Sequence, residues 1–215
     1  MTDVGARARS ILEYLGGQRD AMVEMLVSLA SKESPTDVVA SQAAPQAQLS
    51  ESLKELGYRV RHLPGRETGG HLYAVPKKRL RGAPAQLLMG HSDTVWPIGT
   101  LESMPVVAEN GTVRGPGTFD MKSGLVVGLF ALRALRDLGH QPPATPIWLI
   151  NSDEETGSPE SKRYVELLAK RVARTFVLEP ALGLEGHLKT ARKGVGRFTV
   201  RINGTPAHAG LDPTG

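Results

Sequence analysis

Residues 86–94 read Gln-Leu-Leu-Met-Gly-His-Ser-Asp-Thr, a short apolar run followed directly by glycine, histidine and aspartate. A compact apolar run that ends at a turn residue is typical of a buried central β-strand. Two more apolar runs, at 146–150 and 174–178, are also expected to be central strands, and a largely apolar helix pattern over 125–138 lies between the first and the second. Strands that alternate with helices in this way predict an α/β fold with a mostly parallel sheet flanked by helices.

Shorter segments extend this pattern toward both ends of the chain. Residues 196–203 alternate apolar and polar side chains, which predicts a one-sided strand that leaves the first domain. The other expected elements are a helix over 7–32 that is broken or bent at 16–17, a helix over 45–56, strands over 58–63 and 71–75, a hairpin over 106–114 and a helix over 158–170.

The composition excludes several classes of protein. With 215 residues, 40% of them hydrophobic and 22% charged, the chain has enough apolar surface for an ordinary globular core. The absence of cysteine excludes disulfide scaffolds, a cysteine nucleophile and thiolate metal sites. The net charge is +4, but the basic residues are scattered apart from a short cluster at 77–81, so we expect no nucleic-acid partner. Because the sequence has no membrane-length apolar run and no secretory signal, we expect a cytoplasmic protein without a membrane partner.

Histidine and carboxylate residues follow all three predicted central strands. His91 and Asp93 follow the first strand, Glu154 and Glu155 the second, and Glu179 the third. Sites in open α/β sheets form just beyond the carboxyl ends of the strands. These side chains are therefore expected to converge, although they lie far apart in the sequence.

A further carboxylate, Asp120, lies in the glycine-containing stretch 115–124 immediately before the apolar helix, whose N-terminus favours a negative charge. Taken alone, Asp120 is also explained as a helix cap, His91 with Asp93 as a surface pair, and the acidic run 153–155 as a solvated turn or helix start. Together, five carboxylates in one cleft would repel one another unless one or two divalent cations bind between them. Histidine and carboxylates without cysteine suit Zn²⁺, Co²⁺ or Mn²⁺.

Two pairs of residues suggest roles within such a site. His91 fits a metal ligand and Asp93 fits the carboxylate that orients it, because a metal-bound imidazole usually donates its other N–H to a carboxylate. Glu154 and Glu155 are neighbours in an extended segment, where successive side chains diverge. One of them is therefore able to bind metal while the other takes a proton from the attacking water, which predicts metal-assisted hydrolysis.

In combination, these motifs resemble peptidase family M20, and within it the glutamate carboxypeptidase (carboxypeptidase G2-like) branch. The matching stretches are 89–95, 115–124, 151–157, 178–180 and 207–210. The resemblance implies a zinc-peptidase-like catalytic domain in which His91 and Glu179 bind one zinc ion. It further implies that Asp120 bridges to a second zinc ion, that Glu155 binds this second ion, and that the peptide bond after Asp120 is often cis.

The resemblance also implies catalytic roles. Glu154 corresponds to the general base and Asp93 to the carboxylate that orients His91. His208 corresponds to a histidine that the lid domain brings to the substrate, where it would polarise the scissile carbonyl group.

By the same resemblance, residues 1–193 are the N-terminal part of the catalytic domain, and residues 194–215 are the start of an α+β lid and dimerisation domain. The family pattern continues beyond residue 215 and includes a late histidine that binds the second zinc ion. We therefore expect a truncated form, while the intact family often forms homodimers.

The implied activity is hydrolysis of the amide bond of a C-terminal amino acid, of glutamate type, through a hydroxide held by two zinc ions. The substrates would be peptides or N-acyl amino acids. Two alternatives stay open: an amino-acid deacylase or desuccinylase of the same superfamily, and a non-catalytic fragment or half of a split enzyme. The substrate's acyl group and the arginine that would bind its carboxylate are not identified by the sequence.

Overall fold

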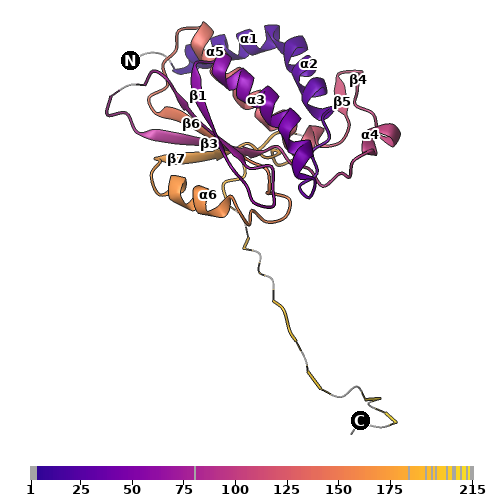
Figure 1. Cartoon of the computed structure of the whole chain (residues 1–215). Coiled ribbons are helices and arrows are strands. Elements are labelled where there is room, and N and C mark those ends of the chain that lie inside the picture. Colours follow the sequence, from indigo (N-terminus) through magenta and orange to yellow (C-terminus); the bar gives the residue numbers. More distant parts are fainter. Residues whose placement is uncertain are drawn as a thin grey trace. The chain divides into compact units, whose positions relative to one another are not determined.

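The computed structural model describes residues 4–79, 81–183 and 185–191, and then 193, 194, 196, 198–201, 203, 204, 207, 208, 210, 211 and 213. The chain divides into two units, Met1–Pro180 and Ala181–Gly215. The first unit is an α/β domain (Figure 1). No helix in the described part of the chain is long and apolar enough to cross a membrane.

A five-stranded sheet forms the centre of the first unit. Its strands, in spatial order, are β1 (Tyr58–Leu63), β2 (His71–Pro76), β6 (Thr145–Asn151), β3 (Ala85–His91) and β7 (Arg174–Val177). Strand β3 pairs in parallel with both β6 and β7, whereas β2 is antiparallel to its neighbours β1 and β6. All strands except β2 therefore run in the same direction, which confirms the predicted α/β fold with a mostly parallel sheet.

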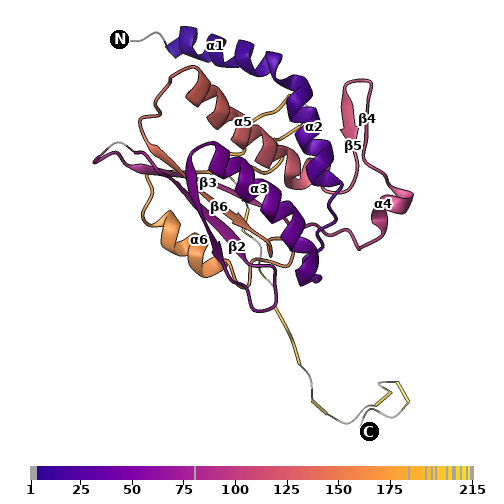
Figure 2. The same cartoon turned by 45° about the horizontal axis from the view of Figure 1, so that its top comes forward.

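Helices cover both faces of this sheet (Figures 1 and 2). The helices on one face are α1 (Val4–Gly17), α2 (Arg19–Ala30), α3 (Ala43–Glu55) and α5 (Ser123–Asp137), and the other face carries α6 (Lys162–Ala169). The smaller elements are η1 (Val39–Gln42), α4 (Thr100–Ser103), the hairpin β4 (Val107–Glu109) and β5 (Thr112–Arg114), and the kinked turn η2 (Thr118–Lys122).

The core has two parts because side chains along a strand alternate between the two faces of the sheet. On β6, Trp148 and Ile150 pack in the larger cluster beneath α2, α3 and α5. Ile147 and Leu149 pack on the opposite face with apolar residues of α6. Burial on both faces explains why the sequence of β6 is continuously apolar instead of alternating.

Most of the predicted elements are confirmed, with local turns setting their ends. The predicted break in the first helix separates α1 from α2, and Gly57, with a φ of +83°, follows the end of α3. Asn110 and Gly111 both have positive φ at the tip of the β4–β5 hairpin. The helix expected over 158–170 begins only at Lys162, because Ser158 has a φ of +59° and the chain turns there before it becomes helical.

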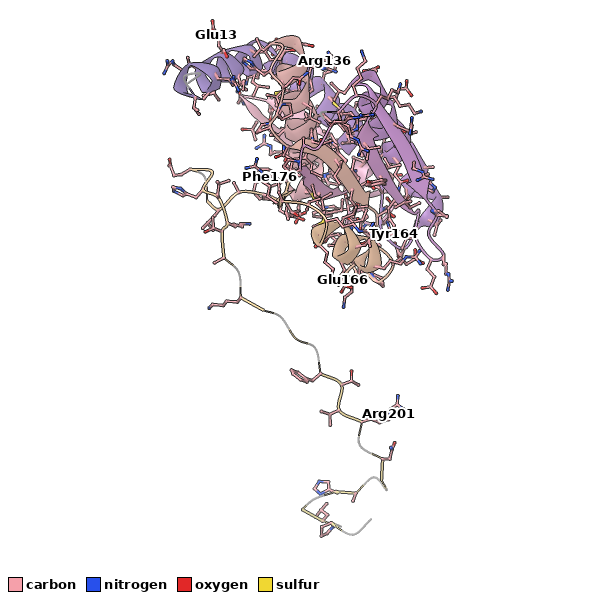
Figure 3. All side chains as sticks on the ribbon, turned by 90° about the vertical axis from the view of Figure 1, so that its left-hand side faces the viewer. Glu13, Arg136, Tyr164, Glu166, Phe176 and Arg201 are labelled. Carbon is pink, nitrogen blue, oxygen red and sulfur yellow. The ribbon has the colours of Figure 1, made fainter. Side chains whose placement is uncertain are left out.

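One expectation about the strands is wrong, and another lies only partly within the described residues. Segment 174–178 was expected to be a central strand, but β7 lies at the edge of the described sheet, where Phe176 is 46% exposed (Figure 3). An apolar run predicts a strand but does not say which neighbours cover it. The strand expected over 196–203 includes positions outside the described residues, and the described residues of this segment are not in a strand; Phe198 among them is 92% exposed.

The carboxyl ends of β3 and β6 lie side by side in the sheet. Helix α5 connects β3 to β6 over one face, and α6 then leads from β6 past β3 to β7 over the opposite face. The connections that leave these two neighbouring strands run over opposite faces of the sheet, which makes the region beyond their carboxyl ends a topological switch point, called the crevice below. In α/β sheets, ligands bind at such points, just outside the carboxyl ends of the strands.

Candidate metal centre

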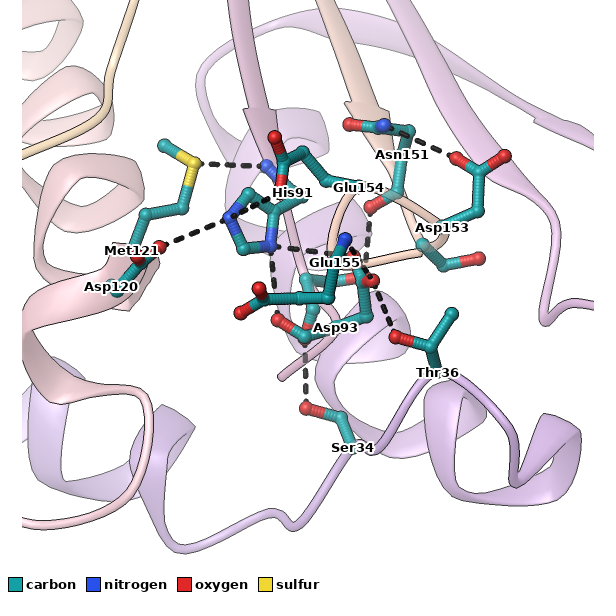
Figure 4. Close-up of polar contacts among 12 residues, drawn as sticks. Ser34, Thr36, His91, Asp93, Asp120, Met121, Asn151, Asp153, Glu154 and Glu155 are labelled. Carbon is teal, nitrogen blue, oxygen red and sulfur yellow. Dashed lines mark hydrogen bonds and ion pairs between the residues drawn. The ribbon is translucent and has the colours of Figure 1, made fainter. Parts of the chain in front are cut away.

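His91 is the last residue of β3, and its imidazole is at the centre of the site (Figure 4). The residue is 1% exposed, and its backbone N–H donates to the Sδ of Met121 at 3.1 Å. Gly90 makes this approach possible, because a Cβ there would lie 2.7 Å from the Met121 Cε and 2.8 Å from a methyl carbon of Leu125.

Three carboxylates surround the Nε2 atom of this imidazole. The distances from Nε2 are 3.2 Å to Asp120 Oδ1, 3.4 Å to Glu179 Oε1 and 3.9 Å to Glu154 Oε2. One ligand atom each from His91, Asp120 and Glu179 lies within 4.8 Å of the other two, so these residues form a group able to hold a metal ion. Glu155 is not part of that group in the described structure.

The two carboxylates of this group reach His91 from different elements. Asp120 lies in η2, and the peptide bond after it is cis, as the resemblance implied. Glu179 follows β7, and it is brought in by a close contact between α5 and the backbone of Leu178. A Cβ on Gly124 would lie 1.8 Å from the carbonyl oxygen of Leu178, so only glycine allows this approach.

Asp93 holds the opposite edge of the imidazole. The His91 Nδ1 hydrogen-bonds to the main-chain oxygen of Asp93 at 2.9 Å and lies 3.3 Å from its Oδ1. The other carboxylate oxygen, Oδ2, accepts the hydroxyl of Thr36 at 2.7 Å and the backbone N–H of Glu155 at 3.2 Å. Asp93 is buried, so these contacts fix both the carboxylate and the ring (Figure 4).

The acidic run after β6 separates into one buried and two more open side chains. Asp153 is fully buried, and its Oδ2 accepts the backbone N–H groups of Glu160 and Ser161, both at 2.8 Å. This anchor holds the loop that presents Glu154 and Glu155 to the crevice. The side chain of Glu154 is 47% exposed.

The charges of the cluster perturb one another. Burial alone would lower the pKa of His91, but hydrogen bonds with Asp93 and Glu179 outweigh it and raise the pKa to about 11. Burial raises the pKa of Glu154 and raises that of Glu155 to about 7, and neighbouring carboxylates add to both effects. Glu154 and Glu155 therefore resist ionisation together, and a divalent cation between them and the other carboxylates would relieve this repulsion.

Sequence reasoning missed three residues of this site. Thr36 and Asp153 carry the hydrogen bonds described above, and nothing in their local sequence marks them as different from ordinary turn residues. The third is Lys122, a buried lysine whose Nζ donates to the main-chain oxygen of Lys32 at 2.8 Å. Burial lowers the pKa of Lys122 to about 8. Only the tertiary contacts distinguish these side chains from surface residues.

His208 belongs to the second unit, Ala181–Gly215. Its Nδ1 accepts the backbone N–H groups of Gly210 and Leu211, at 3.2 and 3.1 Å, within an exposed turn.

The sequence of this chain is similar to those of known proteins. The sequence pattern of peptidase family M20/M25/M40 matches residues 87–209. Carboxypeptidase G2 of Pseudomonas sp. (strain RS-16) is 32% identical over an alignment of 198 residues, which covers 91% of this chain and 47% of that protein. Succinyl-diaminopimelate desuccinylase of Alkalilimnicola ehrlichii is 31% identical over 192 residues, covering 83% of this chain and 49% of that enzyme. The chain thus spans about half the length of these curated relatives.

Solved structures share the fold. Human carnosine dipeptidase 1 superimposes with a TM-score of 0.68 at 17% identity, over 81% of this chain and 41% of that chain. The M20 family metallo-carboxypeptidase Sso-CP2 from Sulfolobus solfataricus gives a TM-score of 0.65 at 20% identity, over 77% of this chain and 38% of that chain. At these identities the likeness concerns the fold alone.

Proposed function

This chain belongs to peptidase family M20/M25/M40, and on that premise we propose that it carries the metal centre and the general base of a metal-dependent amide hydrolase. The family is one of metallopeptidases, and the relatives include both a carboxypeptidase and desuccinylases. We assign it to the carboxypeptidase type, with a preference for a C-terminal glutamate.

The observation that carries this proposal is the group formed by His91, Asp120 and Glu179 at the switch point of the sheet. A nitrogen and two carboxylates without cysteine form a donor set that suits zinc. In the zinc-loaded protein, His91, Asp120 and Glu179 would hold one ion, and Glu155 together with Asp120 would hold a second. Asp93 acts on the metal indirectly, by holding the ring of His91 in one orientation.

When bound, zinc lowers the pKa of a coordinated water and polarises the scissile carbonyl group. Glu154 is the residue proposed to take the proton from the attacking water and pass it to the leaving amine. Its carboxylate lies 3.9 Å from the His91 Nε2, beside the metal group but outside it, and it is half exposed to the crevice from which a substrate would enter. A carboxylate in this position is free to accept a proton, because it is not committed to the metal.

His208 and the segment around it complete the proposal. We assign residues 194–215 to the start of a lid domain whose histidine polarises the substrate carbonyl, and the homodimer to the whole enzyme. These assignments rest on the family resemblance.

A second candidate function is the removal of an acyl group such as succinyl from an amino acid, and the similarity to succinyl-diaminopimelate desuccinylases favours it. Both reactions use the same metal group and differ only in the substrate that the crevice accepts. Comparing N-acyl-glutamate with N-succinyl-diaminopimelate as substrates separates them.

The test of the proposal compares Glu154→Gln with the wild-type chain after zinc loading. We expect both proteins to bind zinc equally, while hydrolysis of N-acyl-glutamate falls at least about 100-fold in the variant. Glu166→Gln, an exposed change of the same chemistry on α6, is the matched control and should leave the rate unchanged. Turnover of Glu154→Gln within a few-fold of wild type would refute its role as the base. A wild-type chain that binds zinc without hydrolysing either substrate would instead favour a non-catalytic fragment.

A further inference from the structure

A second cavity lies far from the metal group. It has a volume of about 300 Å³ and lies between the C-terminal half of α5, the start of β6 and the end of β2. Its lining includes Thr145, the first residue of β6, whereas the metal group adjoins Asn151 at the other end of that strand. Six residue steps at ~3.3 Å each separate the two sites by roughly 20 Å along the strand.

Part of the cavity lining is apolar. It includes Leu56, Leu132, Leu135, Pro142 and Pro146. A partly enclosed cavity of this size and composition is typical of small-molecule sites, which use apolar walls for affinity and a few polar groups for orientation.

Three basic residues are also part of the lining. Lys78, Arg79 and Arg136 line the cavity, and no aspartate or glutamate is among its described lining residues. Arg136, labelled in Figure 3, is already engaged, because its Nε donates to Asp137 at 2.7 Å. Lys78 and Arg79 make no side-chain hydrogen bond or ion pair with any described residue, so their charge is available to a ligand.

His140 adds an unsatisfied polar atom to the same lining. Its Nε2 is shielded from solvent and has no hydrogen-bond partner among the described residues. An unpaired buried nitrogen costs free energy, which a ligand oxygen in the cavity would recover.

We propose that this cavity binds a small organic anion, whose apolar body packs on Leu132 and Leu135 while its carboxylate or phosphate group contacts Lys78 and Arg79. The cavity lies outside the metal group, so the proposal does not depend on the hydrolytic function. It assigns a role to Lys78 and Arg79 of the basic cluster at 77–81, which the hydrolase function leaves unexplained.

The experiment titrates the zinc-free 215-residue chain with hexanoate, with hexyl phosphate and with neutral hexanol, followed by methyl NMR. We expect both anions to shift the methyl signals of Leu132 and Leu135 and to bind more tightly than hexanol. Whichever anion binds more tightly identifies the preferred head group. The methyl spectrum of each variant reports whether the variant is folded.

Charge-reversal variants separate this site from a general attraction of anions. In Lys78→Glu/Arg79→Glu, anion affinity should fall roughly fivefold to thirtyfold, because two cations that contact the ligand are lost. Lys77→Glu/Arg81→Glu alters the net charge of the same cluster by the same amount, but at two residues that do not line the cavity. The anion affinity of this variant should stay within twofold of wild type. Any of three results would overturn the proposal. They are an equal loss of anion affinity in both variants, binding of hexanol as tight as that of the anions, and NMR shifts confined to the methyl group of Met121 beside His91.

Discussion

Gly124 controls whether Glu179 reaches the metal group, and Gly124→Ala therefore tests the geometry of the site. The new Cβ would lie 1.8 Å from the carbonyl oxygen of Leu178, whereas an ordinary contact needs about 3.4 Å. Helix α5 and the backbone after β7 must therefore separate by about 1.6 Å, the difference between the two distances. Because Leu178 directly precedes Glu179, the displacement moves a proposed ligand.

The magnitude follows from that displacement. Alanine is a better helix former than glycine by up to about 1 kcal/mol, which favours the variant. Overpacking against a backbone atom costs about 1–3 kcal/mol or more, so we expect a net loss of stability. Metal ligands must lie within about 0.2 Å of their ideal distances, and a disturbed ligand environment typically weakens metal binding roughly 10- to 100-fold.

The assay measures urea unfolding of the zinc-free chain and zinc affinity by competition with a chromophoric chelator. Gly16→Ala in α1 is the matched control, because nothing lies within 4 Å of a Cβ at that position. We expect this control to be as stable as wild type or more stable, with unchanged zinc affinity. If Gly124→Ala were equally stable and bound zinc within twofold of wild type, the close approach would be refuted. If it were destabilised but bound zinc normally, Glu179 would not be a ligand.

Two further substitutions test the surroundings of the site and the core. Thr36→Val removes the hydroxyl that holds Asp93, so we expect the free energy of unfolding in urea to fall by about 1–3 kcal/mol and zinc binding to weaken. Thr36→Ser should restore both. Unchanged stability of Thr36→Val would contradict this expectation. Burial lowers the pKa of His71 in the folded protein, so on acidification the unfolded chain takes up this proton first. The free energy of unfolding should therefore fall as the pH drops below about 6.5. The total loss should be about 1.4 kcal/mol for each unit by which folding lowers the pKa. In His71→Leu this part of the pH dependence should be absent, and an unchanged pH profile would refute the assignment.

The fold was largely predictable because its signals are local. The apolar runs at 86–89 and 146–150 are continuous since both faces of these strands are covered, and Asn110-Gly111 marks a hairpin tip that requires positive φ. The edge position of β7 was not predictable, because pairing order depends on contacts between distant segments. Its apolar residues fit a central strand equally well.

The candidate site was predictable only in part, for a similar reason. His91 ends β3, Asp120 precedes α5 and Glu179 follows β7, and the topology of the sheet brings such positions together. The supporting contacts follow no local rule: Thr36 reaches Asp93 from a loop 57 residues earlier in the chain. Within one acidic run, Asp153 turns inward to anchor the chain before α6, while Glu154 faces the crevice. Only the folded structure distinguishes these neighbouring carboxylates.

The central claim is that His91, Asp120 and Glu179 bind a metal ion, and zinc titration of the wild-type chain and His91→Ala by calorimetry tests it most directly. His62→Ala, which removes an exposed histidine, is the control for non-specific binding. We predict at least one tightly bound zinc ion per wild-type chain, the same in His62→Ala, and the loss of this binding in His91→Ala. Zinc binding that is absent from the wild type, or that His91→Ala leaves intact, would contradict the account.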